Sequence, residues 1–266
     1  MSQAFGHGRS VVADRVEDGR VLRLVLDAPR SNILTMRLMG ELRDALAMER
    51  DDASLKMVLL RGSGGNFSLG ASVDEHRRDR APAMLSAFCD LVRDVATYPV
   101  PIAAVVEGRC LGGAFEVVLA CHLMFASPGA RMGCPEVKLG VVPPVLAAIG
   151  HLRMGGALAE RLVITGGEID AASAERVGLA TAVVPPEVDP ETWVRGWYQR
   201  TLAPLSAFTL REATFAARQA SGLLAALDAP LDAAERRYLE KLLPSHDGNE
   251  GIEAFLEKRA PRWTDA

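Results

Sequence analysis

The stretch GRCLGGAFEVVLACHLMFASPGARMGCPEVKLGVVPP, residues 108–144, contains the pattern that decides the fold of this chain. An apolar run that ends at Val106 leads into it, a glycine pair stands at Gly112-Gly113, and a second apolar run follows Glu116. Apolar runs separated by glycines predict a buried strand, a tight turn and a helix, in that order.

The same stretch predicts chemistry at the start of that helix. The first N–H groups of a helix have no partner within it, so a turn at Gly112-Gly113 can bind an anion or a carbonyl oxygen that gains charge. Glu116 falls in the first helical turn, and Glu136 supplies a second carboxylate further along. Two carboxylates beside such N–H groups are typical of acid–base catalysis. A plain helix start, with an acidic residue favoured by the helix dipole, also explains the spacing.

The composition is that of an ordinary globular protein, with 266 residues of which 49% are apolar and 24% charged. A net charge of -4 and a pI of 5.8 disfavour nucleic acid as a partner. No apolar run approaches the ~20 residues that cross a bilayer, and the start, MSQAFGHGRS, lacks a signal-peptide core. No C-x-x-C pair occurs, so we expect reduced thiols in a cytoplasmic protein without a membrane partner. The four cysteines are Cys89, Cys110, Cys121 and Cys134.

Apolar periodicity predicts strands alternating with helices, followed by helices alone. Strands are expected at residues 21–26, 57–60, 102–106, 123–126 and 180–184. Helices are expected at residues 35–50, 84–95, 157–164, 170–177, 191–202, 206–219, 231–243 and 247–258. Residues 1–20 are expected to form a loose lead-in, and residues 72–81 a solvated charged segment. The chain is thereby divided into an α/β core with the active site, residues 1–195, and a C-terminal helical region, residues 196–266.

Several other kinds of site are disfavoured. Residues 65–72, GNFSLGAS, are similar to a phosphate loop, but Ala71 stands where lysine would reach the phosphate. The histidines are scattered without an i, i+4 pair, so no metal site is expected. No serine has the G-x-S-x-G frame of a hydrolase. Two glycine turns remain, Gly70-Ala71 and Gly112-Gly113, whose N–H groups form an oxyanion hole if the turns converge.

Five segments together resemble the crotonase superfamily of enoyl-CoA hydratases and isomerases, and the resemblance runs from residue 20 to the C-terminus. They are FSLGAS at 67–72, GRCLGGAFEVVLAC at 108–121, PEVKLG at 135–140, GGEIDAASAERVGLATAVV at 166–184 and EGIEAFLEKRAPRW at 250–263. The resemblance implies an α/β fold in which ββα repeats wind into a spiral, with a C-terminal helical region for trimerisation and CoA cover. It implies homotrimers or dimers of trimers. It also implies an acyl-CoA substrate, of which CoA is a part, and no further cofactor.

Position by position, the resemblance assigns the oxyanion-hole N–H groups to Ala71 and Gly113. Glu116 and Glu136 coincide with the two carboxylates of the hydratases, and many relatives that are not hydratases lack one of them. Water addition is therefore the implied reaction. We expect Glu116 to hold and deprotonate the water and Glu136 to donate a proton to carbon.

The resemblance also implies contacts with the substrate. Arg30 matches a basic position near the CoA phosphates, and Phe255 and Lys258 match C-terminal positions that cover or contact CoA. Ordinary surface charge accounts for Arg30 and Lys258 as well. The other expected substrate contacts are Ser68, Gly70, Ser72, Gly112, Pro135, Val141 and Pro143.

Two departures from the family pattern bear on the substrate. Ser72 stands where many members have aspartate, and residues 140–148, GVVPPVLAA, replace the usual G-x-x-P-G-x-G-G-T at the acyl end of the pocket. The segments SNILT at 31–35, PEVKLGVVPP at 135–144 and 245–263 are most similar to cyclohexa-1,5-diene-1-carbonyl-CoA hydratases of anaerobic benzoyl-CoA degradation. The expected product is 6-hydroxycyclohex-1-ene-1-carbonyl-CoA. General enoyl-CoA or cyclohex-1-ene-1-carbonyl-CoA hydration, isomerisation, and non-catalytic binding on the same fold are the alternatives.

Overall fold

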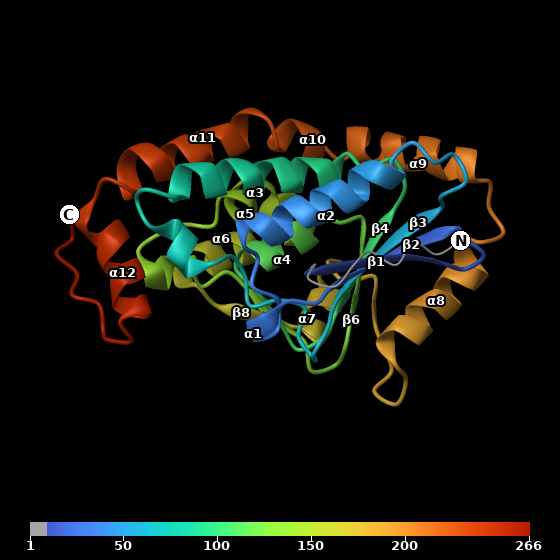
Figure 1. Cartoon of the computed structure of the whole chain (residues 1–266), viewed down its shortest axis with the longest axis horizontal. Coiled ribbons are helices and arrows are strands. Elements are labelled where there is room, and N and C mark those ends of the chain that lie inside the picture. Colours follow the sequence, from blue (N-terminus) through green and yellow to red (C-terminus); the bar gives the residue numbers. More distant parts are fainter. Residues whose placement is uncertain (1–9) are drawn as a thin grey trace.

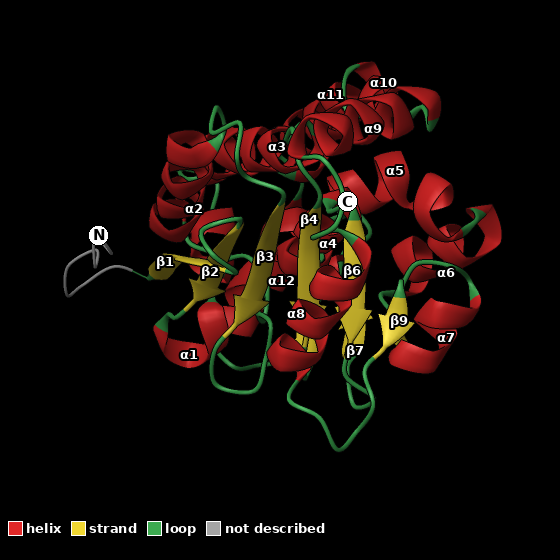
Figure 2. Cartoon of the chain, turned by 90° about the vertical axis from the view of Figure 1, so that its right-hand side faces the viewer, coloured by secondary structure: helices red, strands yellow, loops and turns green. Residues whose placement is uncertain are grey.

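The computed structural model describes residues 10–266, which form a mixed α/β protein built on two sheets (Figures 1 and 2). The larger sheet has the strand order β1-β2-β3-β4-β6-β9, and the smaller has the order β5-β7-β8. Neighbours from β2 to β9 in the larger sheet are parallel, whereas β1 pairs antiparallel with β2. The strands are β1 Val11–Val16, β2 Val21–Leu26, β3 Met57–Gly62, β4 Ile102–Val106, β5 Arg109–Leu111, β6 Leu123–Ala126, β7 Arg131–Gly133, β8 Glu168–Asp170 and β9 Ala182–Val183.

Helices cover the sheets and continue beyond the last strand, and α10 and α11 lie on the outer side of α3 (Figure 1). The α-helices are α1 Pro29–Asn32, α2 Met36–Glu49, α3 Ala81–Ala96, α4 Gly113–Ala120, α5 Pro144–Met154, α6 Gly156–Thr165, α7 Ala171–Arg176, α8 Pro190–Thr201, α9 Ala207–Ala220, α10 Leu223–Ala226, α11 Ala229–Arg237 and α12 His246–Leu256. Two 3₁₀ turns, η1 Val73–His76 and η2 Glu136–Leu139, and a π-helical turn, η3 Tyr238–Leu242, complete the elements. No helix within residues 10–266 has the length and apolar character to pass through a bilayer.

The larger sheet is covered on both faces, which explains the continuous apolar runs of its strands. Val58 and Leu60 of β3 join the main core beneath the helices of one face. Leu59, between them, packs on the other face with Val194 and Tyr198 of α8. Because both faces are buried, the strand shows no alternation of apolar and polar residues.

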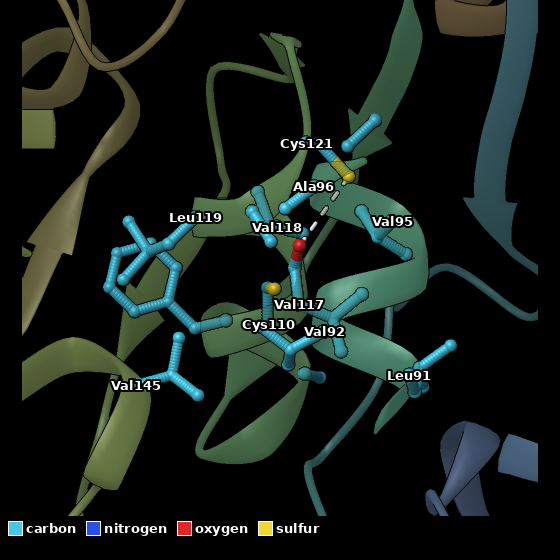
Figure 3. Close-up of a cluster of buried hydrophobic side chains, with 14 of the residues drawn as sticks. Leu91, Val92, Val95, Ala96, Cys110, Val117, Val118, Leu119, Cys121 and Val145 are labelled. Atoms are coloured by element: carbon cyan, nitrogen blue, oxygen red, sulfur yellow. Dashed lines mark hydrogen bonds between the residues drawn. The ribbon is translucent and has the colours of Figure 1, made fainter. Parts of the chain in front are cut away.

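Helix α4 is held in place by α3, as Figure 3 shows. Val92 and Val95 of α3 lie in one buried cluster with Val117 and Val118 of α4. The thiol of Cys121, just beyond α4, donates to the carbonyl of Val117 at 3.5 Å. Burial of one such valine side chain contributes about 1.5–3 kcal/mol. This packing fixes the direction of α4 and hence the position of its N-terminus.

Two isolated bridges fix the glycine loop 62–72, one of them to β5 and the other to the segment that precedes α2. Ser68 pairs with Cys110, and Leu34 pairs with Ala71. The approach is so close at Gly70, where φ is +99°, that an added Cβ would lie 2.6 Å from the carbonyl oxygen of Leu111. Only glycine fits there, so the sequence permits the two glycine turns to meet.

The α/β fold class predicted from the sequence is confirmed, with corrections at particular elements. The loose lead-in is wrong for residues 11–16, which form β1, because antiparallel pairing with β2 orders them. The charged segment 72–81 contains the turn η1. The helix predicted at 231–243 ends as α11 at Arg237 and continues as the π-helical turn. Residues 1–9, which hold His7 and most of the N-terminal stretch considered for a signal peptide, lie outside the described residues.

Strands end at β9, and the described chain is helical from α8 onward. The predicted boundary between residues 195 and 196 falls inside α8, so the division into two regions stays a prediction. The four cysteines are buried and unpaired. Burial raises the pKa of each thiol, which keeps the four sulfur atoms protonated near neutral pH.

A buried carboxylate ties α8 to the sheet. Glu191, in the first turn of α8, is 8% exposed. It accepts hydrogen bonds from Arg23 of β2 at 2.7 Å and from Arg61 of β3 at 2.8 Å. Burial opposes its charge, but the two guanidinium groups hold the pKa of Glu191 below its usual range. The helix is therefore fixed by an ionic contact as well as by apolar packing.

Replacing Glu191 with alanine is expected to lower the free energy of unfolding by about 2–4 kcal/mol, because two partly buried guanidinium groups lose this partner. Urea denaturation measures the change. The matched control is Glu257→Ala, whose carboxylate is 62% exposed and pairs with Arg259. That loss should not exceed about 1 kcal/mol. Equal losses in the two variants would contradict the anchoring role of Glu191.

Candidate active site

A cavity of about 340 Å³, here called the central cavity, lies where the two glycine turns meet. Its wall is mostly apolar, with Leu69, Phe88 and Val142 among its lining. Glu116 and Glu136 both line it. An apolar cavity with a few convergent polar groups has the general form of a ligand site.

Glu116 is held at the start of α5. Its side chain, 2% exposed, reaches from the first turn of α4. One carboxylate oxygen, Oε1, accepts hydrogen bonds from the N–H groups of Val145 at 2.7 Å and Leu146 at 2.9 Å. Pro144, the first residue of α5, has no N–H to offer, so these are the first free donors of that helix. Glu116 is thus a carboxylate bound at a helix N-terminus.

Two opposing effects set the pKa of Glu116. Burial raises it, and the hydrogen bonds from Leu146 and Val145 lower it, which leaves the pKa at about 7. A carboxylate with a pKa near the working pH is suited to take up a proton and to release it.

Glu136 has a different environment. It begins η2, and its oxygen Oε2 is buried without a hydrogen-bond partner among the described residues. Burial raises the pKa of Glu136 well above its ordinary value, and the charge of Glu116 raises it further. Both effects favour the protonated form of Glu136 beside a Glu116 that is partly ionised near neutral pH. Two carboxyl groups separated in this way form an acid–base pair.

The first glycine of α4's turn makes room for Glu136. Gly112 has φ +54°, and an added Cβ would lie 2.8 Å from Oε1 of Glu136. Any larger residue would displace the carboxyl group. Gly112 therefore leaves space for the Glu136 carboxyl group, in addition to allowing the backbone conformation of the turn.

The two glycine turns stand side by side at the wall of the cavity. In the bridge to Leu34, the N–H of Leu34 donates to the carbonyl of Gly70, and the N–H of Ser72 donates to the carbonyl of Leu34. The N–H of Ala71 therefore takes no part in this pairing. Gly113 is the first residue of α4, where N–H groups have no partner within the helix. An added Cβ on Gly113 would lie 3.4 Å from Cβ of Ala71. The arrangement suits two donors for one oxygen atom.

Buried polar groups hold the first turn. The Asn32 amide, fully buried, donates to the carbonyl oxygens of Ser63, Asn66 and Phe67 at 3.0–3.2 Å. The Ser68 hydroxyl donates to the Asn32 carbonyl at 2.6 Å and accepts from the Gly70 N–H at 3.1 Å. Ser68 was expected to contact substrate, but it is buried and lies outside the lining of the cavity. Its hydroxyl supports the loop.

The segment at the acyl end of the predicted pocket enters the cavity one residue later than expected. Val142 and Pro144 line it, rather than Val141 and Pro143. Gly140 is left-handed, and the N–H of Val141 closes a turn on the carbonyl of Glu136, which buries the Val141 side chain in the core. The sequence showed which segment departs from the family pattern, but not which side chains face inward.

The other predicted contacts divide into two groups. Gly70, Pro135 and Phe255 line the cavity together with both members of the glycine pair. Ser72, Arg30 and Lys258 do not, and the last two are exposed. Contacts of Arg30 and Lys258 with CoA stay predictions. Within residues 10–266, no group of three or more His, Cys, Asp or Glu side chains is placed to hold a metal ion.

His76 and Tyr238 are polar residues of the cavity that could not be predicted from the sequence. Nδ1 of His76 lies 2.8 Å from the carbonyl oxygen of Ser72, and a carbonyl only accepts, so Nδ1 carries the proton. Burial lowers the pKa of His76, which keeps the ring neutral. The rings of His76 and Tyr238 lie 6.4 Å apart. Neither residue belongs to a motif, and only the tertiary fold brings them to the cavity.

Comparisons with known proteins agree with this geometry. The family model described as enoyl-CoA hydratase/isomerase matches residues 17–266. The chain is 42% identical to cyclohexa-1,5-dienecarbonyl-CoA hydratase of Thauera aromatica, over 92% of this chain and 93% of the relative. It is 32% identical to 2,3-dehydroadipyl-CoA hydratase of Escherichia coli, over 91% and 94%. A crystal structure of an enoyl-CoA hydratase from Mycobacterium avium subsp. paratuberculosis superimposes with a TM-score of 0.83 at 29% identity, over 96% of this chain and 99% of the other.

Replacing Gly112 with alanine is expected to destabilise the protein by about 1–3 kcal/mol, through backbone strain and contact with Glu136. Urea denaturation measures it, with Gly129→Ala as the control, because nothing lies within 4 Å of a Cβ there. The share of this destabilisation that comes from contact with Glu136 should disappear when Glu136→Ala is also present. The effects of the two substitutions on stability should therefore not be additive. If the losses of unfolding free energy in the two single variants were additive, a Cβ at position 112 would not contact Glu136.

Proposed function

Because the chain belongs to the enoyl-CoA hydratase/isomerase family, and is thus a hydro-lyase of unsaturated acyl-CoA thioesters, we propose that it hydrates cyclohexa-1,5-diene-1-carbonyl-CoA to 6-hydroxycyclohex-1-ene-1-carbonyl-CoA. The name of the Thauera aromatica relative supports this substrate. The apolar wall around Val142 and Pro144 supports a hydrocarbon ring in the cavity.

The observation that carries the proposal is a pair of buried carboxyl groups in one apolar cavity, one bound by two backbone N–H groups and the other with an unpaired oxygen. Glu116, with a pKa of about 7, is the proposed base that takes a proton from water. Glu136, protonated near neutral pH, is the proposed acid that gives a proton to a ring carbon. Water supplies OH to one carbon, Glu136 supplies H to another, and the proton on Glu116 restores the pair for the next turnover.

The N–H groups of Ala71 and Gly113 are the proposed oxyanion hole. As hydroxide adds, negative charge moves onto the thioester oxygen, and two donors placed for that oxygen stabilise the charge. Loss of one such donor costs about 2.7–4 kcal/mol of transition-state stabilisation. The side-by-side turns support this role because each presents an N–H group that the adjoining pairing does not use.

A cyclic diene separates the two reacting carbons. Hydroxide adds to the ring carbon β to the thioester carbonyl, and the charge is shared between the thioester oxygen and the far end of the diene. A proton then joins that far carbon, and the remaining double bond stays conjugated with the thioester. We therefore propose that Glu116 lies beside the ring carbon that receives hydroxide and that Glu136 lies beside the far carbon that receives the proton. A straight-chain enoyl group has no such far carbon to receive the proton.

CoA itself is the proposed ligand of the exposed rim. Phe255, which lines the cavity and is 56% exposed, is placed to cover the CoA moiety. Arg30 and Lys258 are proposed to meet its phosphates. A trimer or a dimer of trimers is proposed as the assembly, and the exposed apolar side chains of Phe208 and Phe215 on α9 support association. No cofactor beyond the substrate's CoA is proposed.

A panel of linear, branched and cyclic unsaturated CoA thioesters tests the substrate. The cyclohexadiene thioester is expected to give the highest kcat/KM, because its hydrocarbon ring fits the apolar wall. In ¹⁸O-labelled water the product should gain one labelled hydroxyl group, which mass spectrometry detects.

The same panel distinguishes the alternatives. A higher kcat/KM for linear or cyclohexene thioesters would replace the proposed substrate by a general hydratase activity. A shifted double bond without ¹⁸O uptake would identify an isomerase. No turnover at all, together with RNA binding in a titration, would indicate a non-catalytic binding protein.

Glu116→Gln and Glu136→Gln are each expected to lower kcat by at least about 100-fold, since each removes one proton-transfer group. Wild-type kcat/KM should rise with pH through about 7, as Glu116 loses its proton, and fall at higher pH as Glu136 ionises. Steady-state rates across pH measure both limbs. Glu257→Gln, at an exposed site, is the control. Near wild-type hydration by both site variants would refute the mechanism.

A further inference from the structure

One more polar side chain in the central cavity has no role in the mechanism above. Tyr238 is 1% exposed, and its hydroxyl oxygen has no hydrogen-bond partner among the described residues. The same holds for Oε2 of Glu136, and both residues line the cavity. Buried polar atoms are nearly always paired, so two unpaired atoms in one cavity call for a common explanation.

The Tyr238 phenol and the Glu136 carboxyl group line the same cavity and interact electrostatically. Burial raises the pKa of Tyr238, and the charge of Glu136 raises it further. The phenol therefore keeps its proton near neutral pH, and it can donate a hydrogen bond. Glu136 lines the same cavity, and its carboxyl group can accept such a hydrogen bond when it is ionised.

The fold holds the tyrosine ring at this place. Tyr238 begins the π-helical turn η3, whose i to i+5 bond runs from the N–H of Leu243 to the carbonyl of Tyr238 at 2.8 Å. π-Helical turns redirect side chains and are frequent at functional sites. The ring also lies beside His76, whose own orientation is fixed by the Ser72 carbonyl. The position of the hydroxyl is thus determined from two elements.

We infer that Tyr238 is a positioning residue for Glu136: its hydroxyl donates a hydrogen bond, directly or through one water molecule, to the carboxylate that forms when Glu136 gives up its proton. This inference rests on the proposed hydration. During that step the proton leaves Glu136 for the substrate carbon, while Tyr238 keeps its own proton. The hydrogen bond strengthens as negative charge develops on Glu136, so it stabilises the transition state more than the ground state.

The other titratable groups around this pair have been assigned. Glu116 of α4 is bound by the N-terminus of α5. The thiol of Cys134 lies 3.8 Å from the carbonyl of Gly112 and is also a side-chain donor to Glu136, whose pKa it lowers, while burial holds the pKa of the thiol itself well above the usual value. Arg109, at the cavity wall, pairs with Glu168, and His76 is neutral. Tyr238 is therefore the O–H donor available to Glu136.

Tyr238→Phe tests the inference, because it keeps the ring and removes only the hydroxyl. Loss of a hydrogen bond to a charged group is expected to lower kcat by about 10- to 100-fold. KM should stay within about twofold, since the lost contact is to Glu136 and not to substrate. The high-pH limb of the rate profile should move upward, because an unstabilised carboxylate has a higher pKa.

A second readout needs no turnover. The carboxyl carbon of Glu136 is followed by ¹³C NMR in the unliganded protein and is identified by its loss in Glu136→Gln. Working in a Glu116→Gln background removes the coupled titration of the neighbouring carboxyl group. Tyr238→Phe is expected to raise the Glu136 midpoint by about one pH unit, the equivalent of a tenfold effect.

Tyr98→Phe is the matched control, since Tyr98 is equally buried and its hydroxyl donates to the Leu46 carbonyl, away from the cavity. Both variants should lose some stability, but only Tyr238→Phe should move the Glu136 titration and kcat. An unchanged titration, or a raised KM with unchanged kcat, would overturn the inference. If the wild type hydrates no thioester, the proposed function fails, and the titration alone still decides the Tyr238 contact.

Discussion

The contact between the Glu116 carboxylate and the first free N–H groups of α5 is the interaction on which the site depends. It joins two helices that are separated in sequence by β6, β7 and η2. Without these donors, burial would drive the carboxyl group to its neutral form. With them, the pKa settles at about 7. The fold thus sets the chemistry of Glu116 through backbone N–H groups, which among the natural amino acids only a substitution by proline removes directly.

Both ends of α4 take part in this electrostatic arrangement. Its N-terminus faces the cavity through Gly113, and the carbonyls at its other end meet one buried and one half-buried guanidinium group. Arg218 donates to the carbonyl of Ala120 at 2.6 Å, and Arg153 donates to that of Cys121 at 3.2 Å. Cations at a helix C-terminus and anions at its N-terminus both favour the helix dipole. The short helix is therefore held in direction by charge as well as by the packing of α3.

The sequence was sufficient for those parts of the site that depend on local chemistry. The glycine turns and both glutamates could be predicted, because turns of this kind need residues without side chains and catalysis needs carboxyl groups. Tyr238 could not, since a π-helical turn places it and nothing in its neighbouring residues signals that turn. The inward facing of Val142 also escaped prediction, because it follows from the left-handed conformation of Gly140. In the fold, β1 escaped because its order comes from pairing with β2.

The double use of α5 limits how such an enzyme can change its substrate during evolution. Pro144 forms part of the pocket wall, and the N–H groups of the next two residues bind the Glu116 carboxylate, which is the proposed base. A mutation that shifts this backbone to admit a new acyl group also alters the proton affinity of Glu116. Viable paths therefore run through side-chain exchanges at the wall, with the helix start left in place. Substrate specificity and the proton affinity of Glu116 therefore depend on the same segment of backbone, although they are separate properties of the enzyme.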